Sequence, residues 1–242
     1  MSLEYSVSIS DYVQVLESRK PSKVLITVPH DGLYGFELEP FLSPRKNGAT
    51  LHDRGVWPIV RDMLGVCGAN VIRGLMSRHY LDYNRNETDA FESPQFQSSY
   101  QAYHGRIFHE LRQMQNRFGS EELLFLDLHG FGTQPSRAPR DGFDLVFGTG
   151  NRSTIPHGEP DQELARFLET RGYTVFLPTE QVQRQPFDPL NGGFTVRAYA
   201  RELGVNAIQI EIAPRFRHRN SAMLGTRLSN DLATFLAERY AI

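Results

Sequence analysis

Hydrophobic and polar positions along the chain follow two patterns. Near-continuous apolar runs, bounded by glycine or polar residues, predict strands buried on both faces of a sheet. They cover 24–28, 70–73, 123–128, 144–147, 174–177 and 207–212. Between them, apolar residues recur at helical spacing, which predicts helices over 54–64, 98–118, 161–170, 195–202 and about 221–240. In the last helix, Leu224, Leu228, Leu232 and Phe235 form one apolar stripe.

The regular alternation of strands and helices predicts an α/β fold. We expect a three-layer α/β/α arrangement with a mixed, mostly parallel central sheet. No linker rich in Pro, Gly and Ser divides the chain, so residues 1–242 are predicted to form a single domain. Long irregular segments at 31–47, 76–93, 129–142 and 178–194 all follow predicted strands. We therefore expect all four to lie at the same edge of the sheet.

Composition narrows the class of protein. Hydrophobic residues make up 40% of the 242 positions and charged residues 22%, which is ordinary for a globular protein. A net charge of -2 favours neither a nucleic-acid partner nor a membrane partner, so a small molecule is the expected ligand. No segment resembles a signal peptide or a membrane span, and the expected compartment is the cytoplasm. The single Cys67 excludes an internal disulfide.

Three predicted strands end in a residue that can bind a metal or carry a proton. His30 and His129 follow the first and third strands, and Glu211 ends the last one. Ligand sites of open α/β sheets lie at the carboxyl ends of the strands, and a catalytic zinc takes three protein ligands and keeps one open position. The pattern indicates a mononuclear metal hydrolase that binds one Zn²⁺ per chain through both histidines. The alternative is that each histidine only bonds to a neighbouring loop.

The third metal ligand is open among several carboxylates. Asp53 lies where a helix begins and is the preferred candidate, although Asp at this position commonly caps a helix. Asp127 shares a strand face with His129, and could either bind the metal or orient that histidine. Glu37 and Asp31 are further candidates.

Glu211 is the candidate general base. A carboxylate at the end of a buried apolar strand is either protonated or paired. A base beside an activated water needs such a raised affinity for protons. The alternative is a structural ion pair with Arg215 or Arg217.

The segment from Arg78 to Arg85 combines arginines with an asparagine. Arginine can bind a substrate carboxylate with two parallel hydrogen bonds, and Asn84 adds a directional one. Its position after the strand at 70–73 favours the edge of the site over an ordinary solvated surface. Arg197, near Gly192 and Gly193, is a further possible anion contact, which a turn at a helix start explains equally well.

At these residues the sequence resembles the N-formylglutamate amidohydrolase family. Each matching motif is short, and their common order between residues 24 and about 219 carries the resemblance. In chain order they are Val28-Pro29-His30-Asp31-Gly32, Asp53 at a helix start, Asp82-Tyr83-Asn84-Arg85, Tyr103-His104, Asp127-Leu128-His129-Gly130, Asp144-Leu145-Val146-Phe147-Gly148, Gly192-Gly193 and Gln209-Ile210-Glu211-Ile212. More distantly, the order of these residues is similar to that of the zinc carboxypeptidases.

The resemblance implies a zinc-carboxypeptidase-like (phosphorylase/hydrolase-like) fold and a role for each residue. His30, His129 and Asp53 would bind zinc and Glu211 would be the general base. Arg78 would stabilise the oxyanion, while Asn84, Arg85 and Arg197 would hold the substrate. The chain departs from the family at Asp31 and Gly130, where serine is common, and at Tyr100, where histidine is common. These departures bear on the identity of the substrate.

Together these features predict a zinc-dependent amidohydrolase that cleaves an N-acyl amino acid such as N-formylglutamate. Two other functions remain open from the sequence. A metallocarboxypeptidase or cell-wall peptide amidase would use the same metal centre on a longer substrate. A non-catalytic carboxylate-binding protein would bind its ligand without turnover and would hold little zinc.

Overall fold

The computed structural model describes residues 5–35, 43–132, 142–177 and 190–240. One sheet of eight strands forms the centre of the molecule, in the order β1-β2-β4-β3-β5-β8-β6-β7. The four strands in the middle, β4, β3, β5 and β8, run parallel to one another. The strands are β1 Tyr5–Ser10, β2 Val13–Ser18, β3 Val24–Val28, β4 Asn70–Gly74, β5 Leu124–Gly130, β6 Leu145–Gly148, β7 Val175–Phe176 and β8 Asn206–Ile212.

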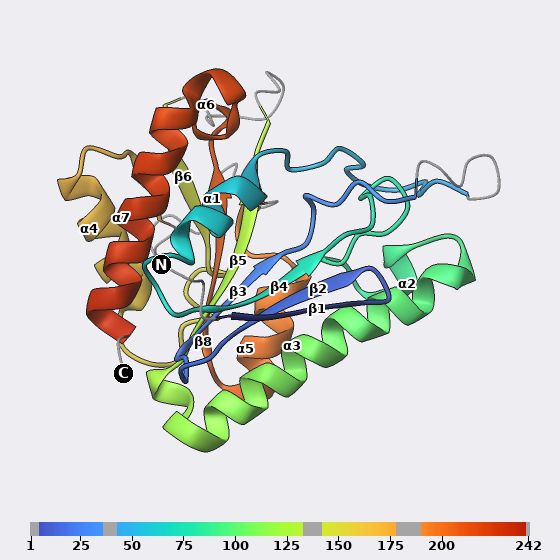
Figure 1. The fold of residues 1–242 in the computed structure, drawn as a ribbon, viewed down its shortest axis with the longest axis horizontal. Helices are drawn as coiled ribbons and strands as arrows, with labels where there is room; N and C mark the ends of the chain where they lie inside the picture. Colours follow the sequence, from blue (N-terminus) through green and yellow to red (C-terminus); the bar gives the residue numbers. More distant parts are fainter. Residues whose placement is uncertain (1–4, 36–42, 133–141, 178–189, 241–242) are drawn as a thin grey trace.

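Helices cover both faces of the sheet (Figure 1). They are α1 Val56–Met63, α2 Glu87–Ala90, α3 Gln97–Phe118, α4 Pro160–Thr170, α5 Phe194–Leu203, α6 Pro214–Arg217 and α7 Ala222–Tyr240. On β3, Ile26 faces the core formed with α1, α4 and α7, while Leu25 faces the core formed with α3 and α5. Burial on both faces explains the continuous apolar runs in the sequence. The predicted three-layer α/β/α fold with a mixed, mostly parallel sheet is confirmed; that it is one domain stays a prediction.

The first two strands form a hairpin that the sequence analysis missed. β1 and β2 pair antiparallel, and the turn residues Asp11 and Tyr12 have φ values of 48° and 59°. Two residues with positive φ are typical of the tight turn that matches strand twist. The signal in the sequence was the alternation of Val7, Ser8 and Ile9 with polar neighbours, which is typical of a strand at the edge of a sheet.

Strand direction corrects one expectation about the loops. β6 pairs antiparallel with β8, and β7 runs parallel to β6. The end of β7 therefore lies at the opposite edge of the sheet from His30 and His129. Of the predicted segment 178–194, residues 190–194 are described, and there the Gly193 N–H donates to Gln209 beside the site at 2.6 Å. Periodicity shows where a strand lies but carries no information about its direction, which depends on tertiary pairing.

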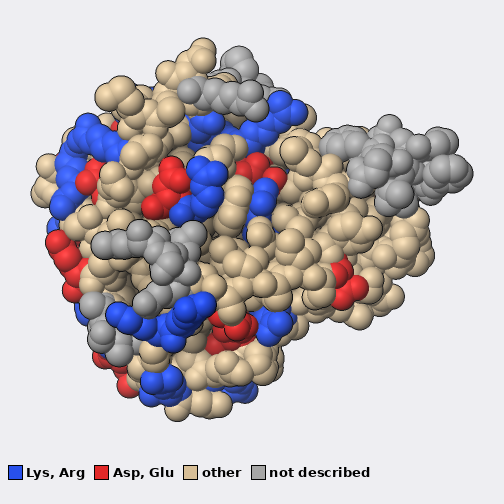
Figure 2. Space-filling model, in the orientation of Figure 1, with Lys and Arg blue, Asp and Glu red and all other residues tan. Residues whose placement is uncertain are grey.

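On the face shown in Figure 2, Lys and Arg side chains lie interspersed with Asp and Glu side chains.

Within the described part of the chain, every helix is too short or too polar to cross a bilayer.

Two carboxylates meet where α3 packs on the hairpin. Glu110 of α3 is only 4% exposed, and Arg106 lies 3.6 Å from Glu17 and 3.8 Å from Glu110. Burial, and then the negative charge of Glu17, raise the pKa of Glu110 to about 7. The folded protein therefore favours a protonated Glu110 more strongly than the unfolded chain does.

We expect Glu110→Gln to stabilise the protein at pH 8 and to change little at pH 4. A raised pKa in the folded state gives stability that is present at low pH and lost as the pH rises through about 7. Glutamine has no charge to bury, so the expected gain at pH 8 is about 1–3 kcal/mol. Urea unfolding at both pH values measures it, with the exposed Glu121→Gln as control. An equal gain at both pH values would contradict the explanation.

Candidate metal centre

The parallel strands bring the predicted site residues together at one edge of the sheet. His30 follows β3, and His129 lies near the end of β5, where it pairs in register with Glu211 of β8. Asp53 comes from the segment before α1, and its backbone N–H donates to the His30 carbonyl at 2.9 Å. All four side chains are buried, with exposed fractions of 7% or less.

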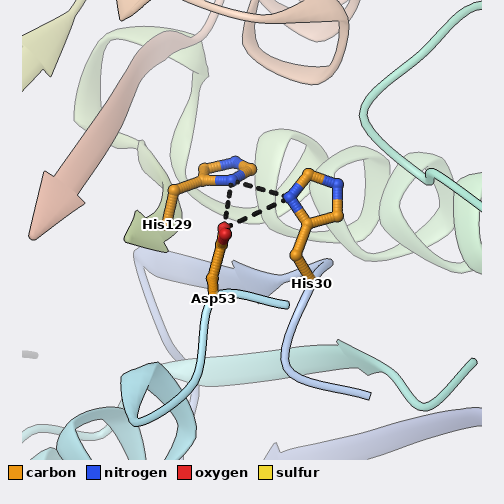
Figure 3. A group of neighbouring side chains, drawn as sticks. All are labelled: His30, Asp53 and His129. Atoms are coloured by element: carbon orange, nitrogen blue, oxygen red, sulfur yellow. Dashed lines mark hydrogen bonds and ion pairs between the residues drawn. The ribbon is translucent and has the colours of Figure 1, made fainter. Parts of the chain in front are cut away.

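His30, Asp53 and His129 direct three ligand atoms at a common point (Figure 3). The two Nδ1 atoms are 3.1 Å apart, and Asp53 Oδ2 lies 3.3 Å from His30 Nδ1 and 3.2 Å from His129 Nδ1. Tetrahedral zinc, with bonds of about 2.0–2.2 Å to N and O, holds neighbouring ligands about 3.3 Å apart. The three atoms therefore already have the spacing of one face of a zinc tetrahedron.

A carboxylate stands behind each histidine. Nε2 of His30 lies 2.7 Å from Asp82 Oδ1, and Nε2 of His129 lies 2.9 Å from Asp127 Oδ2. Thr27 Oγ1 donates to the other oxygen of Asp127 at 2.6 Å. Carboxylates accept hydrogen bonds, so each Nε2 carries its proton and each Nδ1 presents a lone pair to the centre. Three electron-pair donors in contact fit a bound cation.

The same contacts separate the candidates for the third ligand. Asp53 is in the group, whereas Asp127 lies on the far side of His129. Asp31 Oδ2 accepts a hydrogen bond of 2.6 Å from the Trp57 N–H in the first turn of α1. Asp31 thus supplies the helix-start contact that was the alternative role for Asp53. Glu37 lies outside the described residues.

The charge state of the group follows from these contacts. Burial alone would lower the pKa of His129, but Asp127 and Asp53 raise it well above its usual value. Burial would raise the pKa of Asp53, but hydrogen bonds to His129 and His30 lower it far below its usual range. Without a cation, these contacts thus favour a proton on His129 and keep Asp53 ionised.

Glu211 lies beside the group with one oxygen held in place. Gln209 Nε2 donates to Glu211 Oε1 at 2.9 Å, and burial raises the pKa of the Glu211 carboxyl. The alternative, an ion pair with a following arginine, does not occur among the described contacts. Arg215 pairs with Asp144, and Arg217 donates to backbone carbonyls.

Three arginines surround the carboxylate of Asp82. Arg78 Nε and Arg45 Nη1 lie 3.2 Å and 3.3 Å from its Oδ2, and Arg85 Nε lies 3.6 Å away. The Arg45 side chain is buried, whereas that of Arg85 is 45% exposed. Arg78 also approaches Asp53 Oδ1 at 3.5 Å, which places its guanidinium next to the metal group. Arg85 is therefore the member of the cluster best placed to meet a ligand from solvent.

We expect Asp82→Asn to weaken both the fold and the metal centre. The amide keeps an acceptor for His30, but it leaves the buried Arg45 without its negative partner and removes one of the two carboxylates near Arg78. Breaking a buried ion pair costs about 3–5 kcal/mol, and losing the carboxylate behind a ligating histidine costs about 10–100-fold in metal affinity. Urea unfolding and zinc competition titrations measure the two effects, with the exposed Asp89→Asn as control. Wild-type zinc affinity in Asp82→Asn would contradict this role.

Asn84 and Arg197, which were predicted to contact the substrate, form hydrogen bonds within the protein instead. The Asn84 side chain accepts from the backbone N–H and hydroxyl of Thr195 at 2.9 Å each, and donates to Gln209 at 3.3 Å. Its amide nitrogen also lies 3.2 Å from His129 Nε2, so it belongs to the wall of the site. Arg197 is exposed and donates to the Asn191 carbonyl at 3.0 Å. None of the contacts among the described residues joins Arg197 to the metal group.

Sequence reasoning gave no separate role to Asp82, Arg45 and Gln209. Asp82 carried a usable signal, because a carboxylate two residues before Asn84-Arg85 suits a partner for a ligating histidine. Arg45 and Gln209 carried none: one comes from an irregular segment and the other from the middle of an apolar strand.

Comparison with solved structures identifies the fold. A crystal structure of N-formylglutamate amidohydrolase from Ralstonia eutropha JMP134 superposes with a TM-score of 0.69 at 19% identity, covering 95% of this chain and 99% of its own. The crystal structure of a gene product from Agrobacterium tumefaciens covers 94% of both chains, with a TM-score of 0.69 at 16% identity.

No family model matches the sequence, and no curated protein matches it. The two solved structures confirm the resemblance at the level of the fold. A shared fold at this identity does not carry an activity with it, so the function has to be argued from the site.

Proposed function

We propose that this protein is a zinc-dependent amidohydrolase that releases an amino acid from its N-acyl form. The observation that carries the proposal is the convergence of His30 Nδ1, His129 Nδ1 and Asp53 Oδ2 at 3.1–3.3 Å, with a carboxylate behind each histidine. The fold shared with an N-formylglutamate amidohydrolase from Ralstonia eutropha JMP134 makes N-acyl amino acids the substrate class to test first. N-formylglutamate is accordingly the first substrate to test.

The donor set suits zinc. Two imidazoles and one carboxylate are a common set of three protein ligands at catalytic zinc sites, which keep the fourth position open for water or substrate. When bound there, zinc would supply Lewis acidity, which makes water more acidic and polarises a carbonyl. We assign one ion per chain to His30, Asp53 and His129.

Glu211 is proposed to move the proton. Gln209 holds its Oε1, so Oε2 would be the oxygen that accepts a proton from a water bound at the site. The carboxylate takes a proton from the attacking water and delivers it to the departing amide nitrogen, so that the amine leaves neutral. Its raised pKa suits this exchange, because a stronger base accepts the proton more readily.

Arginines are proposed to receive the charges of substrate and transition state. Arg78 lies next to Asp53 and would stabilise the oxyanion that develops on the scissile carbonyl. Arg85 is the exposed guanidinium of the Asp82 cluster and would hold the substrate carboxylate. Asn84 would fix the segment that carries Arg85, since its amide ties that segment to Thr195 at the start of α5. Arg197 would contact only the distal part of a substrate.

The decisive experiment compares hydrolysis of N-formyl, N-acetyl and N-succinyl amino acids with hydrolysis of dipeptides. We expect turnover of an N-acyl amino acid with a free carboxylate, loss of activity on dialysis against a chelator, and recovery on adding zinc. Turnover that the chelator leaves unchanged would exclude the metal mechanism. Turnover of dipeptides alone would favour a carboxypeptidase. Tight binding without turnover would indicate a binding protein.

A further inference from the structure

The guanidinium of Arg217 joins three separate segments of the chain. Nη1 donates to the Arg54 carbonyl at 2.7 Å, Nη2 to the Phe131 carbonyl at 2.7 Å, and Nε to the Ile212 carbonyl at 3.0 Å. These three bonds use one N–H from each of the three nitrogens of the planar guanidinium. Arg217 ends the short helix α6, which follows β8.

Each joined segment carries one member of the proposed site. Arg54 directly follows Asp53, Ile212 directly follows Glu211, and Phe131 comes two residues after His129. The charge of Arg217 also faces these residues: burial lowers its pKa, while Asp53, Glu211 and Asp31 act in the opposite direction. One side chain therefore sets the spacing between the segments that hold two metal ligands and the base.

Two glycines make room for this arrangement. A Cβ on Gly130 would lie 2.3 Å from Arg217 Cζ and 2.5 Å from its Nε. A Cβ on Gly55, which has a φ of 86°, would lie 2.2 Å from the Arg217 carbonyl oxygen. Side chains at these positions cannot coexist with Arg217 as it stands. Gly130 is also where the sequence departs from the serine common in the similar family. In this chain a side chain at that position would collide with the Arg217 guanidinium, which explains the glycine.

We infer that Arg217, in the space left by Gly130, is a positioning residue that holds Asp53 at zinc-binding distance from His129 and in register with Glu211. The inference rests on the proposed metal centre and is independent of which N-acyl amino acid is cleaved. Asp53 comes from a segment outside the sheet, and among the described residues no backbone–backbone hydrogen bond joins it to β5 or β8. The Arg217 fork supplies that link.

The test measures zinc affinity and kcat in Arg217→Met, which keeps the bulk of the side chain but removes all three donors. We expect zinc affinity to fall about 10–100-fold, as for other groups that orient metal ligands. With saturating zinc, kcat should fall while KM stays close to wild type, because the substrate contacts are untouched. Arg215→Met is the matched control, since it removes an arginine from the same helix that pairs with Asp144 instead.

Gly130→Ala gives the second, independent variant. Its methyl group should displace the guanidinium and reproduce the loss of zinc affinity. The double variant Gly130→Ala with Arg217→Met should then be no worse than Arg217→Met alone, because the two changes remove the same interaction. Methylguanidinium in solution should partly restore kcat to Arg217→Ala, whose truncated side chain leaves space for it, but not to the double variant Gly130→Ala with Arg217→Ala, whose added methyl group fills that space.

The outcomes separate this inference from the proposed function. Wild-type zinc affinity in Arg217→Met, or losses that add in the double variant, would overturn the positioning role. A lower melting temperature with unchanged zinc affinity would make Arg217 merely structural and would also overturn it. Failure of every N-acyl amino acid as a substrate would refute the proposed function, yet the zinc titrations would still decide the role of Arg217.

Discussion

His129→Ala should purify without stoichiometric zinc and without hydrolytic activity. The substitution removes one of the three ligand atoms, and the remaining pair, His30 and Asp53, would hold zinc weakly. It also leaves Asp127 buried without its histidine partner. We therefore expect a loss of several orders of magnitude in metal affinity, together with a loss of stability in the apo protein.

Elemental analysis of the purified variant measures its zinc content directly, and an assay with added zinc measures its hydrolytic activity. His109→Ala is the matched control, because His109 is exposed on α3 and its hydrogen bond among the described residues is to Gln113, away from the metal group. That variant should keep one zinc and full activity. Full zinc content in His129→Ala would show that the ligand assignment is wrong.

Glu211→Gln should give a slow enzyme that retains its zinc. Glutamine keeps the size of the side chain and can still accept the hydrogen bond from Gln209, but it cannot take a proton from water. A general base acts in the transition state, so kcat should fall by about 10²–10⁴-fold with little change in KM. Zinc content should remain close to wild type, because Glu211 lies outside the group of ligand atoms.

Metal analysis and steady-state kinetics on the same preparation distinguish the possible roles of this residue. Loss of zinc would make Glu211 a ligand and would direct the search for the base to Asp31 or Asp127. Unchanged kcat would leave it a structural carboxylate. The exposed Glu202→Gln controls for the loss of one negative charge and should behave as wild type.

The predictions for His129→Ala and Glu211→Gln concern different steps, metal binding and proton transfer, because carboxylates lie behind the histidines but not behind Glu211. Asp82 and Asp127 fix each Nε2 proton, and so determine that both Nδ1 atoms present lone pairs. If the proposed function is correct, changes at His129 or Asp82 should therefore act on metal binding. Glu211 has no such link and should act on proton transfer, so its loss should separate chemistry from binding.

The sequence by itself determined the layers of this protein and the strand ends that carry the candidate site. Burial on both faces of a sheet requires unbroken apolar runs, and burial of one helix face requires apolar residues at helical spacing. These local requirements are visible in the sequence without a partner. A histidine or glutamate at the end of such a run stands out, because an unpaired polar group there would be costly. His30, His129 and Glu211 could be identified on that ground.

Only the tertiary structure decided what stands next to these residues. The sequence favoured Asp53 as the third ligand but left Asp127 and Asp31 open, because all three are carboxylates that can bind a metal. They are separated by the neighbour that each one meets: the metal group, His129 or the Trp57 N–H. The grouping of Arg45, Arg78 and Arg85 around Asp82, and the fork of Arg217 across three segments, join residues from different parts of the chain. Such contacts depend on strand order, strand direction and the paths of irregular segments. These are set by packing across the whole sheet, and local periodicity does not encode them.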